Sequence, residues 1–375
     1  MKPRYSFRRI LSFPALILAG SIATPCVQAT SDSWSVDAAG NWATFGSWLS
    51  GTQAPGSTTT DNTDIATFNM LLTLAGKTVT VDTDRYIGGI SFGNTSAFGY
   101  TLGTGILHLN SGGVIQTLSG NGNHTDTISS AIVISGTSGA TATFTAGATS
   151  ATSLLNIGAV TGSATSGNTT TLTLNGTNTG ANLVSGIIGD GASAGKLALN
   201  KSGAGTWVLT GANTYTGATT LSAGGLTLGG ASGALALSST AISLAGGTFT
   251  LDNTGVGNNN TGRIDDTQAI RLGGGSLVYK GSDQASTNST ETVGAITQAG
   301  GNDAITVTFG GTNTATLTAT SFIHTLGNAS TLVNGTSLGK DTASTASVGR
   351  LMILGTAPTL VGTTAALGTG INSAV

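Results

Sequence analysis

Residues 199–230 read LNKSGAGTWVLTGANTYTGATTLSAGGLTLGG. Glycines at 203, 205 and 211 bracket a short strand-like stretch, residues 206–210. A polar turn with one aromatic side chain follows at residues 213–217, and residues 219–222 and 226–228 begin the next strands. Because glycine adopts positive φ at little steric cost, this stretch predicts short strands joined by tight turns.

The same pattern continues outward along the chain. Aliphatic residues alternate with Thr, Asn or Ala in residues 78–82, 106–110, 171–175, 197–200 and 305–309. This period of two sends the aliphatic side chains mainly to one face of a strand. Strand centres lie about 8 to 12 residues apart, a spacing typical of all-β folds. Helical patterns of useful length are absent, and the abundant Gly and Thr would weaken a helix.

Composition excludes several classes of protein. The 375 residues include 59 glycines and only 7% charged residues, whereas an average chain has about 7% glycine and about 25% charged residues. A single glutamate, Glu291, rules out a long charged helix, and 13 Lys plus Arg cannot supply a basic surface for nucleic acid. A hydrophobic content of 38% with a net charge of −2 argues against charge-driven disorder. A secreted, β-rich, repetitive structural protein remains.

Two β architectures fit this pattern. One is an antiparallel sandwich, which would suit a binding module. The other is a parallel β-helix, in which each coil stacks on the last. The scarcity of charged and aromatic residues favours the β-helix. With three strands to a coil, we expect roughly 24 to 30 residues per coil and about 10 to 13 coils. At about 4.8 Å per coil the rod would be roughly 50 to 60 Å long.

A resemblance to a known family supports this architecture. Residues 199–230 resemble the autotransporter-associated β-strand repeat, also called the passenger-associated transport repeat. Two further segments, residues 34–48 with their three tryptophans and residues 291–296, resemble parts of secreted bacterial proteins that carry the repeat. The resemblance implies a right-handed parallel β-helix on or outside the outer membrane of a Gram-negative-type bacterium. The positions that match the repeat are Lys201, Gly203, Gly205, Trp207, Leu209, Gly211, Asn213, Tyr215, Gly217, Thr219, Gly224 and Leu226.

Residues 1–29 are predicted to be a cleaved secretory signal peptide. Four basic residues precede a mostly apolar core at residues 10–19, and residues 27–29 (Val-Gln-Ala) offer a small-residue cleavage site. Cleavage there would remove the single cysteine, Cys26, and leave 9 basic against 15 acidic residues. We therefore expect a mildly acidic β-helical passenger-like region, residues 30–375, without disulfides.

The export route is a separate question. Autotransporters in this family end in a membrane β-barrel, whose strands need about 10 residues each with an apolar outer face. Nothing after Leu351 fits that pattern. We expect that the sequence is a fragment or that export uses another route, and that any membrane contact depends on an anchor outside this chain.

Candidate catalytic motifs are few and have simpler explanations. Residues 191–195 (Gly-Ala-Ser-Ala-Gly) match the nucleophile-elbow pattern, but residues 196–200 predict a strand where the elbow needs a helix. His108, His124 and His324 are far apart in sequence and keep no metal-ligand spacing.

Aspartates form the other candidate group. Residues 61–64 (Asp-Asn-Thr-Asp), Asp82 with Asp84, and Asp265 with Asp266 could bind calcium or act as an acid–base pair. The favoured interpretation is that they cap turns.

These observations predict a secreted or surface-displayed structural or adhesive β-helix that is not an enzyme. We expect no catalytic, cofactor-binding or metal-binding residues, and no cofactor. The expected partner is a cell-surface or extracellular polysaccharide, and not nucleic acid. The alternative is an extracellular carbohydrate-active β-helix enzyme, a polysaccharide lyase or glycoside hydrolase, that uses the Asp pairs.

Overall fold

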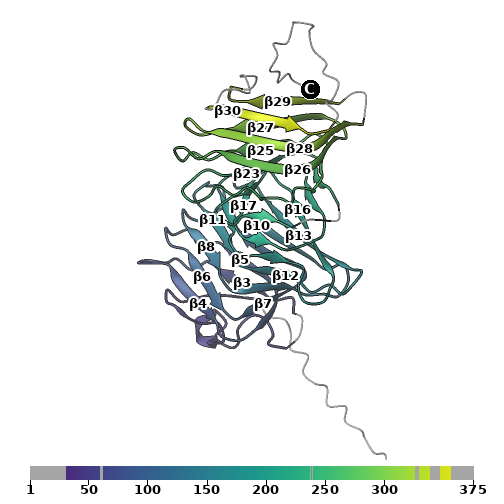
Figure 1. Ribbon diagram of the computed structural model, residues 1–375. Helices are drawn as coiled ribbons and strands as arrows, with labels where there is room; N and C mark the ends of the chain where they lie inside the picture. The colour runs from purple at the N-terminus through teal and green to yellow at the C-terminus, as the bar shows by residue number, and fades with distance from the viewer. Residues whose placement is uncertain are drawn as a thin grey trace, which may run out of the picture.

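The computed structural model describes residues 31–59, 62–236, 238, 240–325, 329–337 and 347–355. These residues form a parallel β-solenoid of about 10 turns (Figure 1). The predicted signal peptide and Cys26 lie outside the described residues, as do Asp61 and the end of the chain after residue 355. No helix in the described residues is long and apolar enough to cross a membrane.

Two long sheets run along the solenoid, and every pair of strands in the described residues is parallel. The first sheet has a main path of thirteen strands and a side branch, β9 (Ala131–Ile134), β12 (Val160–Gly162) and β15 (Ile188–Gly189). The main path is β1 (Asp32–Ser33), β3 (Ile65–Phe68), β5 (Arg85–Phe92), β7 (Ile106–Thr117), β10 (Thr141–Ala146), β13 (Thr169–Gly176), β16 (Lys196–Lys201), β19 (Thr219–Leu221), β22 (Ile242–Leu244), β24 (Ile270–Leu272), β26 (Ser289–Gln298), β28 (Thr314–His324) and β30 (Val348–Ile353).

The second sheet is a single column of twelve strands. A short third sheet pairs β18 (Ala212–Asn213) with β21 (Ala234–Leu235), and one 3-10 helix, η1, spans Phe45–Ser47. The column is β2 (Gly40–Asn41), β4 (Lys77–Val81), β6 (Tyr100–Thr104), β8 (Thr125–Ile128), β11 (Leu154–Ile157), β14 (Asn182–Val184), β17 (Thr206–Leu209), β20 (Gly225–Leu228), β23 (Thr248–Asp252), β25 (Ser276–Lys280), β27 (Asn302–Thr308) and β29 (Ser330–Gly335).

The central coils have three strands each, as predicted. One coil runs through β11, β12 and β13, and the next through β14, β15 and β16. Each of these strands pairs with its counterpart in the following coil. The parallel solenoid is therefore confirmed, and the antiparallel sandwich is wrong. The right-handed sense of the coil stays a prediction.

Coil length varies more than the sequence indicated. Thr141 of β10 aligns with Thr171 of β13, which makes this coil one of the longer ones. Trp207 of β17 aligns with Leu226 of β20, a much shorter step along the chain. The predicted range of coil lengths is too narrow, because the coil after β17 closes with two very short strands, β18 and β19.

The alternating pattern sorts side chains between core and surface. In β13 the buried residues Leu172 and Leu174 alternate with the partly exposed Thr171 and Thr173. The same alternation recurs in β16 and β27. The core is therefore a continuous stack of aliphatic side chains along the inside of the rod.

An aromatic cluster closes the first coil. Trp34, Trp42, Trp48 and Phe68 are at most 1% exposed, and their ring centroids lie 5.2 to 6.3 Å apart. The indole N–H of Trp42 donates to Pro55 O, and that of Trp48 donates to Trp42 O. This cluster covers the end of the core with large apolar surfaces. The three tryptophans of residues 34–48 thus act together as a cap on the end of the core.

Candidate functional site

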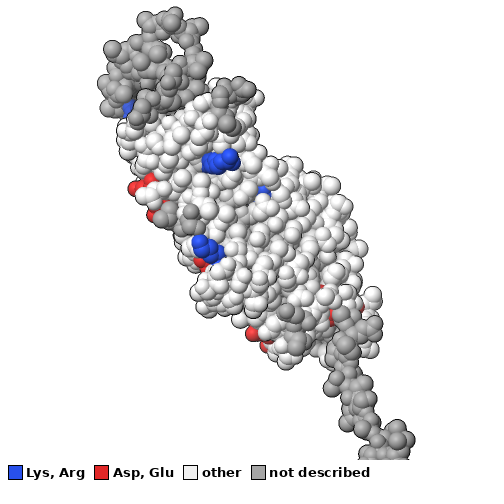
Figure 2. All heavy atoms as spheres, turned by 90° about the vertical axis from the view of Figure 1, so that its right-hand side faces the viewer, with Lys and Arg blue, Asp and Glu red and all other residues white. Residues whose placement is uncertain are grey.

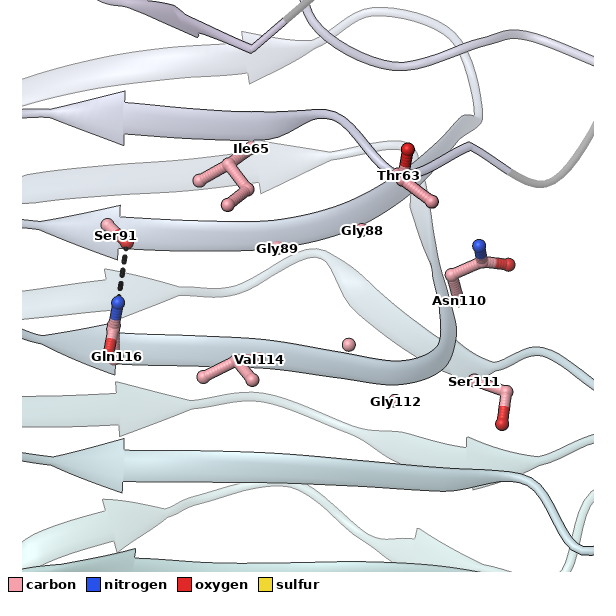
Figure 3. Close-up of a pocket in the computed structure, with 11 residues that line it drawn as sticks. Thr63, Ile65, Gly88, Gly89, Ser91, Asn110, Ser111, Gly112, Val114 and Gln116 are labelled. Carbon is pink, nitrogen blue, oxygen red and sulfur yellow. Dashed lines mark hydrogen bonds between the residues drawn. The ribbon is translucent and has the colours of Figure 1, made fainter. Parts of the chain in front are cut away.

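A groove crosses three successive strands of the first sheet, β3, β5 and β7 (Figure 3). At this point β5 and β7 bend, and their pairing shifts register between Ile87 and Gly89. Ile65 aligns with Gly89, and Gly89 aligns with Val114. The outward row of side chains is therefore interrupted by a residue without a side chain, which leaves a hollow between Ile65 and Val114.

Backbone crowding explains the glycines in the floor of this groove. A Cβ on Gly88 would lie 2.6 Å from the backbone of Thr63, and one on Gly89 would lie 2.8 Å from Val114 O. The N–H groups of Gly88 and Gly89 both donate to Asp64 O, at 2.9 and 3.0 Å. The floor of the groove is therefore close-packed backbone, hydrogen-bonded to the preceding coil.

The groove has polar ends and an apolar middle. At one end Gln116 Nε2 donates to Ser91 Oγ at 3.0 Å (Figure 3). Thr63, Asn110 and Ser111 lie at the other end, and Ile65 and Val114 lie between. The groove measures about 270 Å³, and none of the described residues that line it is charged.

The segment that opened the sequence analysis forms one short coil and the start of the next. It enters through β16, passes β17, β18 and β19, and ends in β20. Its polar side chains bind neighbouring coils. Trp207 Nε1 donates to Asn175 O at 3.0 Å in the coil below. Asn213 accepts from Ile188 N and donates to Ala234 O, both at 2.9 Å, so it joins the coils on either side.

Comparison with known proteins agrees with this geometry. The family model of the passenger-associated-transport-repeat matches residues 199–228. Residues 199–228 are a passenger-associated-transport-repeat. No curated protein and no solved structure matches the chain.

The repeat contains a fully buried lysine. Lys201 is 0% exposed, and its position in the inward column aligns with Leu174 and Leu221 in the adjacent coils. Its Nζ donates to the carbonyl oxygens of Ser202, Gly203 and Ala223 at 2.7, 2.8 and 3.1 Å. Burial lowers the pKa of Lys201 to about 8. The ammonium therefore acts as a three-way donor inside the turns of the repeat.

Gly224 closes the turn above Lys201. Its φ is +68°, and an added Cβ would lie 2.3 Å from Gly205 O and 2.7 Å from Lys201 Nζ. Tyr215 is 2% exposed, so the aromatic of the predicted polar turn lies in the core of the repeat, with its hydroxyl 2.9 Å from Thr219 Oγ1.

The predicted aspartate pair 265–266 lies beside a second hollow of about 460 Å³. Asp265 Oδ1 accepts from the N–H and hydroxyl of Thr267, and these hydrogen bonds lower its pKa.

Glu291 is a buried carboxylate whose pKa is affected by its burial and by the charge of Asp266. It accepts hydrogen bonds from Ile264 N at 3.0 Å and Arg263 N at 3.3 Å. Burial raises the pKa of Glu291 to about 7. Glu291 is 1% exposed and does not line the hollow, so its carboxylate serves to hold backbone N–H groups in place.

Arg263 locks the loop after β23 onto the preceding coil. Its guanidinium is fully buried and donates to Gly233 O, Gly230 O and Asn258 O at 2.7 to 2.9 Å. A short hydrogen bond to Asn253 Oδ1 completes the set. Sequence reasoning missed Arg263, because a single basic residue carries no motif, and it named Lys201 only as a position that matches the repeat.

The other predicted aspartates also bind backbone. Asp82 Oδ1 accepts from Ala43 N at 3.2 Å, and Asp84 Oδ1 accepts from Ile106 N at 3.1 Å in the next coil. Asp64 Oδ2 accepts from Gly56 N at 2.8 Å. In the part of the chain that the structure describes, no three His, Cys, Asp or Glu side chains gather into a candidate metal site.

The three histidines lie apart. His108 stacks on Tyr86, with ring centroids 4.2 Å apart, and His324 bonds to Gln298 Oε1. His124 is buried between two acceptors, Ser96 O at 2.9 Å from Nδ1 and Asp126 Oδ2 at 3.1 Å from Nε2. Burial opposes the charge, yet the hydrogen bond and ion pair with Asp126 raise the pKa of His124.

Ser193 occupies an exposed bend before β16. Because strand β16 follows in place of a helix, residues 191–195 do not form a nucleophile elbow. The predicted strand at residues 196–200 is confirmed.

Proposed function

We propose that this chain is a secreted or surface-displayed passenger-like protein of a Gram-negative-type bacterium, with a structural or adhesive role and no catalytic activity. The observation that carries the proposal is the passenger-associated-transport-repeat built into the solenoid. The repeat is a full coil whose strands pair with the coils before and after it. The whole rod is therefore continuous with a segment typical of autotransporter passengers.

The surface suits an extracellular rod. Charged side chains are scattered singly or in small groups over the face shown in Figure 2, among a large uncharged area. The outward positions of the strands carry mainly Thr, Ser and Asn, as in β13. Such a surface favours a neutral or weakly polar partner over nucleic acid, which binds through phosphate charge. We propose an extracellular or cell-surface polysaccharide as that partner.

Cell fractionation tests the location. The full chain, expressed with its predicted signal peptide in a Gram-negative host, should be recovered from the medium or from the protease-accessible outer surface. A variant in which Lys2, Arg4, Arg8 and Arg9 are replaced by Asp should stay inside. Recovery of the unaltered chain in the cytoplasm would overturn the proposal.

The absence of catalysis has its own test. Purified protein should release no product from neutral or acidic polysaccharides. The structural argument is that Asp82, Asp265 and Glu291 are bound to backbone N–H groups rather than facing one another. Turnover that disappears in Asp82→Asn or Asp265→Asn would establish the enzyme alternative instead.

A further inference from the structure

We propose that the groove across β3, β5 and β7 binds one neutral pyranose unit of a polysaccharide chain. The proposal builds on the surface role argued above and assigns the binding to a particular place. The first argument is shape. The hollow of about 270 Å³ lies just below the range of small-molecule sites, about 300 to 1,000 Å³. It therefore suits a single ring rather than an extended ligand.

The second argument is the order of polar and apolar groups along the groove. A pyranose ring presents apolar C–H surface in its middle and hydroxyls around its rim. The groove presents Ile65 and Val114 in the middle, and Ile65 is 42% exposed although it is a large hydrophobic residue. The Ser91–Gln116 pair stands at one end and Asn110 at the other (Figure 3). Amide and hydroxyl groups both donate and accept, as sugar hydroxyls require.

The third argument concerns charge. None of the described residues lining the groove is Lys, Arg, Asp, Glu or His. A uronate, sulfate or phosphate would find no cation there to replace its lost hydration. The neutral lining thus selects a neutral sugar over an acidic one.

The fourth argument is that the groove is preformed. Its floor is held by the two hydrogen bonds from Gly88 and Gly89 to Asp64 O, and by strand pairing on both sides. A rigid site loses little conformational entropy when it binds a ligand. On the same two strands, Tyr86 and His108 stack at 4.2 Å with an interplanar angle of 8°, which adds a rigid contact between β5 and β7.

Affinity electrophoresis of the purified full chain tests the inference. Gels contain dextran, galactomannan or polygalacturonate, so that two neutral polysaccharides are compared with an acidic one. We expect at least one neutral polysaccharide to retard the protein and polygalacturonate to leave it unaffected. Retardation by polygalacturonate alone, or by none of the three, would overturn the proposal.

Matched variants locate the site. Val114→Trp should fill the groove and abolish retardation. Thr173→Trp is the control, because Thr173 lies in the same outward row, two strands further along. Equal retardation of the Val114→Trp variant and the unaltered chain would exclude the groove as the site.

A milder variant keeps the test decisive if Val114→Trp fails to fold, as judged by circular dichroism. Gln116→Ala removes one side-chain hydrogen-bonding group and should weaken binding about three- to tenfold. Unchanged binding in Gln116→Ala would then count against the groove. Because these measurements use purified protein, their failure leaves surface display untouched, whereas a failed fractionation experiment leaves groove binding untouched.

Discussion

Replacing Gly224 with alanine should destabilise the solenoid at the centre of the passenger-associated-transport-repeat. Two costs add at this position. Its φ of +68° is a left-handed conformation that costs an L-residue about 1 to 2 kcal/mol. The new Cβ would also lie 2.3 and 2.4 Å from two backbone oxygens, of Gly205 and Gly203. Overpacking of this kind costs about 1 to 3 kcal/mol. We therefore expect a loss of about 2 to 5 kcal/mol in unfolding free energy.

Two other glycines separate these costs. Gly139 has a similar φ, +64°, but an added Cβ would meet nothing within 4 Å, so Gly139→Ala should show the backbone cost alone. Gly46 has open space and no positive φ, so Gly46→Ala should be almost neutral. The expected order of destabilisation is Gly224→Ala, then Gly139→Ala, then Gly46→Ala.

Urea unfolding followed by circular dichroism measures the series, and hydrogen exchange shows where the damage lies. Repeat structures can unfold in parts, so the amides of Gly225 and Thr248, which donate to Gly205 O and Gly224 O, report on the mutated turn itself. These two amides should lose protection in Gly224→Ala and keep it in Gly139→Ala. If Gly224→Ala costs no more than Gly139→Ala, the argument that stacked turns exclude a Cβ is refuted.

Three further predictions follow from buried groups. His124 has its pKa raised in the folded protein, so its contribution to stability should be present below pH 6.5 and lost as the pH rises through the raised value. Urea unfolding at pH 5.5 and 9 should show this loss in the unaltered chain and a smaller one in His124→Gln. Glu291 has a pKa raised from 4.5 to about 7, so stability should fall between these values as pH rises, and Glu291→Gln should remove that part of the slope. Trp207→Phe removes the bond to Asn175 O and part of a buried ring, and thermal unfolding should show a loss of about 1 to 3 kcal/mol.

Much of the fold could be predicted because it depends on local pattern. The predicted strand at residues 78–82 corresponds to β4, residues 171–175 lie within β13, and residues 305–309 overlap β27. A period of two identifies which residues point inward, and glycine identifies the turns. Neither signal depends on which coil a strand pairs with, so both can be read from the sequence without knowing the register of the strands.

The groove could not be predicted, because it depends on register. Ile65, Gly89 and Val114 belong to three successive coils and become neighbours only when β3, β5 and β7 stack. The bend at Gly88 and Gly89 shifts that register, and no local pattern fixes the size of the shift. Lys201 did leave a signal. It follows Leu197 and Leu199 at the same parity, so the alternation places its side chain in the core.

The placement of the basic residues changes what the low charge implies. Eight basic residues lie in the described part of the chain, and three of them, Arg85, Lys201 and Arg263, are at most 6% exposed. Lys201 and Arg263 donate their hydrogen bonds mainly to backbone carbonyls of the turns. These three cations thus serve the interior, which leaves fewer positive charges on the outside than composition alone indicates.

The uncharged groove leads to a prediction about the salt dependence of binding. Binding through Lys or Arg weakens steeply as salt rises, because charged contacts are screened and counterions are released. Binding through the hydroxyls, amides and aliphatic groups of the groove should change little. Retardation by a neutral polysaccharide should therefore be nearly the same at 50 mM and 500 mM sodium chloride. A loss of more than about tenfold over that range would show that charged residues outside the groove carry the interaction.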